Sequence, residues 1–184
     1  MTPRGRNAWA FAALALATVG IGSAAFAQQL TFMPKGGRQL LLQVVGKPPD
    51  TAQLREYAGA KHTEAEWRAI LAGRKTGLAE RETATLAAYL EVNMPLPDAA
   101  LQGDIAAALA PDGQALAENS CQSCHSIFTS YLTQSRDVQG WRNIFLSPFH
   151  RGLKLDERER EEFARYSAIN MPMKVDDVPS DIRF

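Results

Sequence analysis

Apolar and polar residues recur along this chain with the period of an amphipathic α-helix, and no segment has the two-residue alternation of a β-strand. The pattern predicts helices over 37–45, 63–71, 79–92, 113–120, 141–146 and 156–169. Two of the helix starts carry capping signals, Thr63 with Glu66 and Asp156 with Glu159. We therefore expect an all-α fold.

Three motifs occur twice along the chain in the same order. They are W-R-x-I at Trp67 and Trp141, L-x-E-R-E at Leu78 and Leu155, and Y-x-x-x-N-M-P at Tyr89 and Tyr166. The first pair is 74 residues apart and the other two pairs are 77 apart, so the second copy holds three extra residues between its Trp and its Leu. The chain is thus predicted to form two related helical units, 28–97 and 98–184, joined at Pro95-Leu96-Pro97.

Residues 1–27 have the pattern of a secretory signal peptide. Arg4 and Arg6 precede an apolar run rich in alanine and leucine, and Ala25-Phe26-Ala27 supplies small residues before a cleavage site. We expect cleavage before Gln28 and export to a bacterial periplasm. An uncleaved membrane anchor is the alternative, because 9–27 is just long enough to span a bilayer. No later segment is long and apolar enough to do so.

Composition narrows the class of protein only slightly. Cleavage would leave 157 residues with 18 basic and 20 acidic side chains, a net charge near −2. That length is enough for one ordinary domain or two very small ones. Because no basic run or strongly basic face is present, nucleic acid is not an expected partner.

The only two cysteines, Cys121 and Cys124, form the sequence C-x-x-C-H with His125. This is the attachment signature of a c-type haem: two thiols on one helical turn form thioethers with the porphyrin vinyl groups, and the histidine binds the iron. A structural zinc site would need about four ligands, and no second Cys or His pair lies nearby. A redox disulfide of the thioredoxin type would need a βαβ pattern, which is absent. The sequence predicts one covalent haem c.

The first copy lacks this motif. Projecting 121–125 back by 74 residues reaches 47–51, Lys-Pro-Pro-Asp-Thr, which has neither thiol nor imidazole. We interpret the chain as a duplicated haem unit whose first copy has lost its cofactor. Trp67 and Trp141, present in both copies, are expected to be core residues.

With these residues in view, the second half resembles a class I c-type cytochrome. The order C-x-x-C-H, W-x-x-I, a loop with Gly152, Leu155 and an acidic helix ending near Tyr166 is similar to the small cytochrome subunits of sulfite dehydrogenases and the haem domains of quinohaemoprotein amine dehydrogenases. The resemblance covers about 98–172. It implies an axial methionine seven residues after the Trp, where this chain has Pro148.

Three side chains are therefore candidates for the distal iron ligand. His150 lies in the loop where such cytochromes carry that ligand, in the lengthened part of the second copy. Met171 and Met173 are the alternatives, since His/Met ligation is common in cytochromes c. Met171 has a twin, Met94, in the haem-free copy, which favours a packing role for it. An open or water-bound iron is the remaining arrangement.

The coordination of the iron decides the function. A haem bound by two protein side chains transfers single electrons and does not readily take a substrate. We expect a periplasmic electron carrier and not an enzyme, either free or as the cytochrome subunit that accepts electrons from a partner oxidoreductase. The alternative is a haem-based gas binder or peroxidase-like protein with an open distal site. A third hypothesis gives the haem-free half the role of binding the redox partner.

Overall fold

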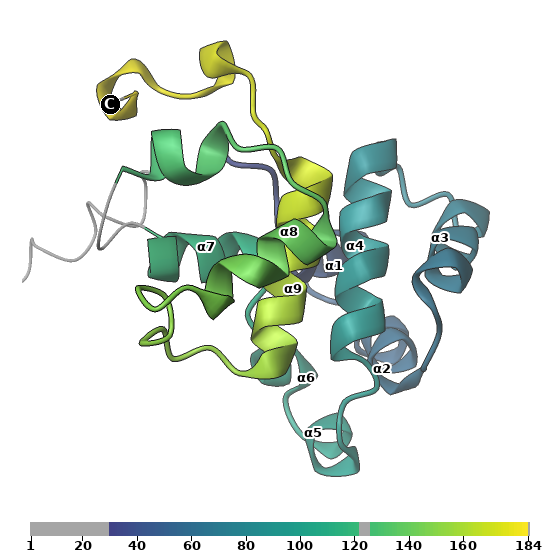
Figure 1. Ribbon diagram of the computed structural model, residues 1–184. Helices are drawn as coiled ribbons and strands as arrows, with labels where there is room; N and C mark the ends of the chain where they lie inside the picture. The colour runs from purple at the N-terminus through teal and green to yellow at the C-terminus, as the bar shows by residue number, and fades with distance from the viewer. Residues whose placement is uncertain (1–29, 122–125, 184) are drawn as a thin grey trace, which may run out of the picture. The chain divides into compact units, whose positions relative to one another are not determined.

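A computed structural model describes residues 30–121 and 126–183 of the chain. The described residues from 32 onward belong to one compact unit. Within the described ranges every regular element is a helical segment and none is a strand, which confirms the predicted all-α class (Figure 1). No helix of these ranges is long and apolar enough to cross a bilayer.

Helices α1 (Gly37–Val44), α3 (Glu64–Gly73) and α4 (Glu80–Asn93) form where the hydrophobic pattern predicts them. The start of α3 is fixed by the predicted capping box. The Thr63 hydroxyl accepts the Glu66 N–H, and the Glu66 carboxylate accepts the Thr63 N–H at 2.7 Å. These two bonds satisfy donors that the first helical turn would otherwise leave unpaired.

Helix α2 (Thr51–Gly59) was not predicted. The Asp50 carboxylate caps it by accepting the backbone N–H groups of Ala52 and Gln53, at 2.9 and 3.1 Å. The helix buries Leu54 and Tyr57 in the core of the first half. An aspartate followed by apolar residues at helical spacing was therefore a usable signal in spite of the two prolines before it.

The second half contains three main helices and several short ones. They are α5 (Asp98–Gln102), α6 (Ile105–Ala108), α7 (Gly113–Cys121), a π-helical turn (Phe128–Leu132), α8 (Val138–Asn143), a 3₁₀ turn (Ile144–Leu146), α9 (Glu157–Asn170) and two terminal 3₁₀ turns (Val175–Asp177 and Ser180–Ile182). Asp156 caps α9 as predicted, accepting the Glu159 N–H at 2.8 Å.

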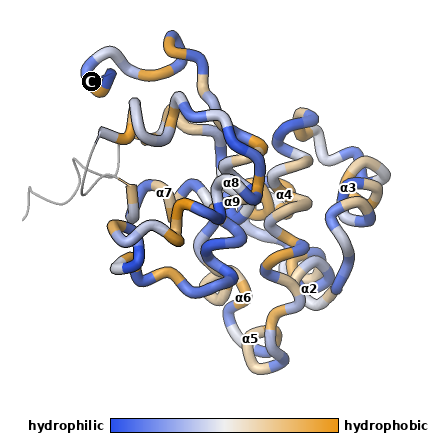
Figure 2. Tube along the Cα trace, in the orientation of Figure 1, coloured by the Kyte–Doolittle hydropathy of each residue, from blue (hydrophilic) through white to orange (hydrophobic). Residues whose placement is uncertain are grey.

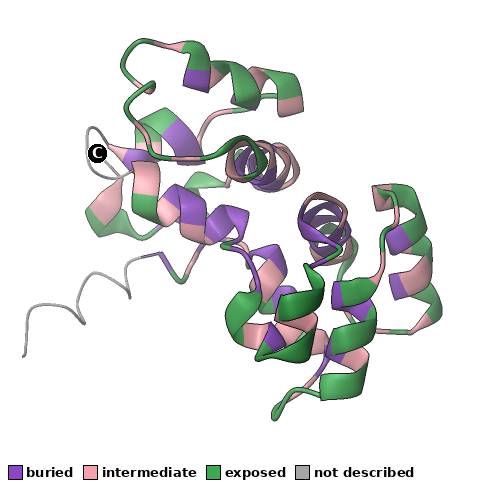
Figure 3. Cartoon of the chain, turned by 90° about the horizontal axis from the view of Figure 1, so that it is seen from below, coloured by how far each residue is buried: buried purple, intermediate pink, exposed green. Residues whose placement is uncertain are grey.

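Helices α4 and α9 pack against each other, and each is covered by two helices of its own half. Helices α1 and α3 pack on α4, and α7 and α8 pack on α9 in the same way. Figure 3 looks along α4 and α9 and shows buried residues gathered in them, with exposed residues on the outer faces of the surrounding helices. Figure 2 shows the matching hydropathy, with hydrophobic positions along α4 and hydrophilic ones in the first turns of α9.

The two halves use the same close contact between a glycine and a tyrosine. A Cβ added to Gly37 at the start of α1 would stand 2.1 Å from Cβ of Tyr89. A Cβ added to Gly113 at the start of α7 would stand 2.1 Å from Cβ of Tyr166. Only glycine lets either helix approach its tyrosine this closely.

The same tyrosines also join the halves to each other. The Tyr89 hydroxyl donates to the carbonyl of Ala110, three residues before Gly113, at 2.9 Å. The Tyr166 hydroxyl donates to the carbonyl of Pro34, three residues before Gly37, at 2.5 Å. The contacts are reciprocal, so the halves meet across a local pseudo-twofold axis.

These contacts correct one detail of the sequence analysis. Gly37 and Gly113 occupy equivalent positions and are 76 residues apart, whereas the projection from the tryptophans used 74. The counterpart of Cys121 is therefore Val45, and the segment equivalent to C-x-x-C-H is 45–49, not 47–51. The two-residue difference lies between the glycine and the tryptophan, where the first half builds α2. Segment 45–49 also has no thiol or imidazole.

Candidate functional site

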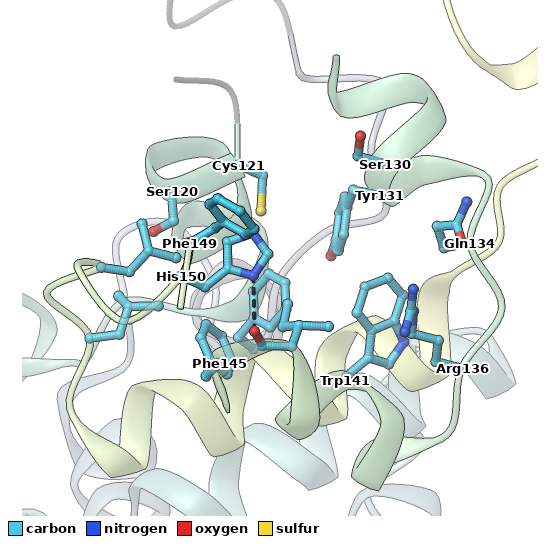
Figure 4. A pocket seen from close by; sticks show the side chains of 14 residues that line it. Ser120, Cys121, Ser130, Tyr131, Gln134, Arg136, Trp141, Phe145, Phe149 and His150 are labelled. Carbon is cyan, nitrogen blue, oxygen red and sulfur yellow. Dashed lines mark hydrogen bonds between the residues drawn. The ribbon is translucent and has the colours of Figure 1, made fainter. Parts of the chain in front are cut away.

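The second half contains a cavity of about 610 Å³ that lies against Cys121 (Figure 4). Aromatic side chains form much of its wall, and these are Tyr131, Trp141, Phe145, Phe149 and Phe163. The remaining lining residues are Ser120, Ser130, Gln134, Arg136, Ile144, His150, Leu153 and Leu155. Its size and apolar character are those of a site for a small organic ligand or cofactor.

Helices α7, α8 and α9, the π-helical and 3₁₀ turns and the loops beside them bring this wall together. Helix α7 ends at Cys121, the π-helical turn contributes Tyr131, and α8 contributes Trp141. The Trp141 ring packs edge-on to Tyr131 and to Phe163 of α9, with ring centroids 5.2 and 6.0 Å apart. Trp141 is 1% exposed, which confirms it as a core residue, and it forms one side of the cavity.

Cys121 is poorly suited to act as a nucleophile in this environment. Burial raises the pKa of its thiol to about 12. The thiolate is the reactive form of cysteine, and at neutral pH such a thiol is almost entirely protonated. A reactive-cysteine function therefore has no support in the described part of the chain.

His150 lies in the cavity wall and is half-buried. Its Nδ1 is 2.9 Å from the carbonyl oxygen of Ile144 (Figure 4). A carbonyl can only accept a hydrogen bond, so Nδ1 carries the proton and the ring lone pair is on Nε2. Metal-binding histidines commonly use this arrangement, in which a backbone carbonyl orients the ring through its other nitrogen.

The two candidate methionines do not line this cavity. Met171 ends α9 and is 6% exposed, with its N–H donated to the Ser167 carbonyl. Its counterpart Met94 ends α4 in the same way and is 2% exposed. The Met173 N–H donates to the Leu132 carbonyl at 2.8 Å. Of the three predicted distal ligands, the structure thus brings only His150 to the cavity with Cys121.

One end of the cavity is polar, a feature that the sequence analysis missed. Arg136 lies over the Trp141 ring, with its Cζ 5.6 Å from the centroid, and Gln134 lies beside it (Figure 4). The Trp141 Nε1 is buried and has no hydrogen-bond partner in the described part of the protein. The Nε1 of the counterpart Trp67 is likewise buried and unpartnered among the described residues, so the side chains that make this end of the cavity suited to an anionic group are Arg136 and Gln134.

The first half has a packed core instead. Tyr57 of α2 lies against Trp67, with ring centroids 5.9 Å apart, and both are nearly inaccessible. Leu54 and Val45, the counterpart of Cys121, belong to the same buried cluster. Ile105 of α6 also joins it, although it follows the predicted boundary at 97. Leucine and tyrosine side chains thus fill the core of the first half.

Several predicted features lie outside the described residues. They are the signal peptide 1–27 and the motif residues Cys124 and His125. Comparison of the chain with protein-family models, with curated proteins and with solved structures gave no match.

Proposed function

We propose that the second half of this chain binds one haem c covalently through Cys121 and Cys124, with His125 as the proximal iron ligand. The observation that carries this proposal is the cavity of about 610 Å³ beside the one described motif cysteine. The corresponding part of the other half, where Val45 replaces Cys121, is filled by side chains. A space of this kind beside C-x-x-C-H is what a porphyrin requires.

The chemistry of the cavity supports this cofactor. The macrocycle is flat and apolar, and Trp141, Phe145 and Phe163 offer it aromatic surfaces. The two haem carboxylates lie on the edge opposite the vinyl groups. Arg136 and Gln134 would hold these carboxylates, while Cys121 would hold the vinyl edge.

His150 is the proposed distal ligand. It lies in the cavity wall, the Ile144 carbonyl fixes the tautomer that leaves the lone pair on Nε2, and neither Met171 nor Met173 lines the cavity. Two imidazoles on the iron would make a six-coordinate, low-potential haem. Such a haem exchanges single electrons with another redox protein.

The function that follows is periplasmic electron transfer by a monohaem cytochrome, either free or as the subunit that accepts electrons from a partner oxidoreductase. Export would depend on the signal sequence in residues 1–27. The fold would consist of two tandem cytochrome-c-like units. The repeated contacts of Gly37 with Tyr89 and of Gly113 with Tyr166 support this, with only the second unit carrying haem.

The test is production of the full-length chain in a bacterium that attaches haem c in its periplasm. The mass of the exported protein should correspond to residues 28–184 plus one haem that survives denaturation and acid–acetone extraction. A Cys121→Ala/Cys124→Ala double variant should carry none. Two haems, or no haem in the wild type, would overturn the proposal. Carbon monoxide binding to the reduced wild type would instead favour a ligand-binding or peroxidase-like function.

A further inference from the structure

Glu162 is a buried acid at the interface between the halves. It belongs to α9 and is 2% exposed. Its Oε1 accepts the backbone N–H of Gly113 at 2.9 Å, and its Oε2 accepts the side-chain N–H of Asn93 at 3.1 Å. No ion pair to Glu162 occurs among the described residues.

The charged and titratable groups around this carboxyl come from every helix that packs on it. Asp112, at the start of α7, is itself buried and adds negative charge. Tyr89 of α4 and Tyr166 of α9 are neutral hydroxyl groups whose pKa values burial raises. The charge of Arg165 acts in the opposite direction, but this side chain is hydrogen-bonded to Glu91 and Glu161.

Several further cations lie near these groups but none neutralises Glu162. The charge of Arg38 of α1 reaches Tyr89, as does that of Arg158 in the first turn of α9. Arg142 of α8 pairs with Glu161. Burial and the charge of Asp112 therefore outweigh the two hydrogen bonds and raise the pKa of Glu162 to about 8.

The repeat shows that the fold does not need an acid here. Asn93 donates to Glu162, and its counterpart Asn170 donates to the Thr85 hydroxyl at 3.0 Å. Thr85 and Glu162 are 77 residues apart, so they occupy equivalent positions. A neutral hydroxyl satisfies the interface in the half without the C-x-x-C-H motif, and the titratable group occurs only in the half that has it.

Glu162 is also close to the cavity. The next residue, Phe163, lines it, so the carboxyl and the cavity lie within about one helix width, roughly 10–12 Å, of each other. The helix whose first N–H binds Glu162 is α7, and its last residue is Cys121. A charge change in the cavity would act on Glu162 through a protein interior that screens it weakly.

We propose that Glu162 is a proton-binding site coupled to the redox state of the haem in this half, which rests on the function proposed above. When a one-electron donor protein reduces ferric to ferrous iron, the cavity loses one positive charge. A proton from bulk water then forms an O–H bond with the Glu162 carboxylate. Oxidation of the iron by the acceptor reverses both changes.

The size of the coupling follows from the separation. One unit of charge at about 10–12 Å in an effective dielectric of about 20 changes the proton affinity of a carboxyl by on the order of tenfold. For a one-electron couple, tenfold corresponds to about 59 mV. The midpoint potential should therefore fall by roughly 60 mV as the pH rises through the range around 8, because the carboxylate stabilises ferric iron.

The test is spectroelectrochemical titration of the holoprotein between pH 5.5 and 9.5. In the wild type the midpoint potential should fall around pH 8. In Glu162→Gln and Glu162→Thr this fall should be absent, and the potential should stay at the higher value that the wild type has at acid pH. Glu157→Gln, which removes an exposed acid from the same helix, should show the same fall in potential as the wild type. Redox-difference infrared spectra of the wild type at pH 8 should gain a protonated-carboxyl band on reduction.

Failure of this inference is separable from failure of the proposed function. A protein without a haem spectrum would contradict the haem assignment. A normal haem spectrum with the same pH dependence in wild type and Glu162→Gln would overturn the role of Glu162. So would a wild-type difference spectrum without the carboxyl band, a measurement that needs no variant to fold.

Discussion

His150 donates a hydrogen bond from Nδ1 to the backbone carbonyl of Ile144, at 2.9 Å, and so presents Nε2 as the basic nitrogen of its ring. The acceptor belongs to the 3₁₀ turn that extends α8, an element that also contributes Phe145 to the cavity. The orientation of the imidazole is thus set by backbone next to the cavity wall. This geometry leads to the first prediction.

Replacing His150 by alanine should open the iron to carbon monoxide. The reduced variant should show a carbon monoxide difference spectrum, whereas the reduced wild type should not. Met171→Leu is the matched control, because Met171 ends α9 outside the cavity lining. It should alter stability and leave the haem spectrum unchanged. A far-red methionine–iron band in the oxidised wild type, lost on changing Met171 or Met173, would refute the His150 assignment.

Substitution of either interhelical glycine should destabilise the protein. The new Cβ of Gly37→Ala or Gly113→Ala would meet a tyrosine Cβ at 2.1 Å, so the helices must separate. We expect a loss of about 3 kcal/mol in the free energy of unfolding by urea titration, toward the upper end for overpacked sites. Gly73→Ala, in a helix with no atom within 4 Å, should be neutral or stabilising by about 0.5–1 kcal/mol. Equal effects at all three positions would argue against the close crossing.

The free energy of unfolding should fall as the pH rises from about 4.5 to about 8. Glu162 keeps its proton in the folded state up to a pKa of about 8, whereas in the unfolded state it releases the proton near the ordinary glutamate pKa of 4.5. In that window the folded state binds more protons, so this group contributes a loss of up to about 1.4 kcal/mol per pH unit. Urea unfolding at several pH values measures this dependence of the free energy of unfolding on pH. Glu162→Gln should flatten the profile, and an unchanged profile in that variant would show that Glu162 ionises normally.

The segment joining the halves should resist proteolysis. Leu96 is 6% exposed, and its N–H donates to the Ala58 carbonyl at 2.8 Å. The peptide bonds at Leu96 are therefore not accessible to a protease. The hydroxyls of Tyr89 and Tyr166 further tie each half to the other. Limited digestion should therefore yield no stable fragments cut at 95–97. Urea unfolding followed by tryptophan fluorescence and by circular dichroism should give coincident transitions. Release of two independently stable halves would disprove this.

The helices with strong local signals could be predicted from the sequence. Thr63 and Asp156 mark the starts of α3 and α9 in the sequence, because a capping residue and its partner lie three residues apart and need no distant contact. The repeated W-R-x-I likewise locates two buried tryptophans. Helix α2 was not predicted, although Asp50, directly after Pro48 and Pro49, caps it.

The features that depend on how separate elements pack and turn could not be predicted in this way. Glu162 lies in an acidic, arginine-rich stretch typical of a solvated face, and it is buried only because Asn93 and the start of α7 cover it. The polar end of the cavity depends on Arg136 lying over Trp141, five residues away. His150 could be placed near the site from its loop position alone, whereas its bond to Ile144 requires the turn between them.

The pseudo-twofold contact of α4 and α9 has a consequence for how this interface can change. When two identical subunits meet across a symmetry axis, every substitution appears on both sides at once. Here the two sides are encoded separately, so each can vary alone. Thr85 and Glu162 show this. They occupy equivalent positions on the two sides of the axis, but one is a hydroxyl residue and the other is an acid. Joining two units in one polypeptide thus allows a symmetric architecture to hold a single, one-sided ionisable group.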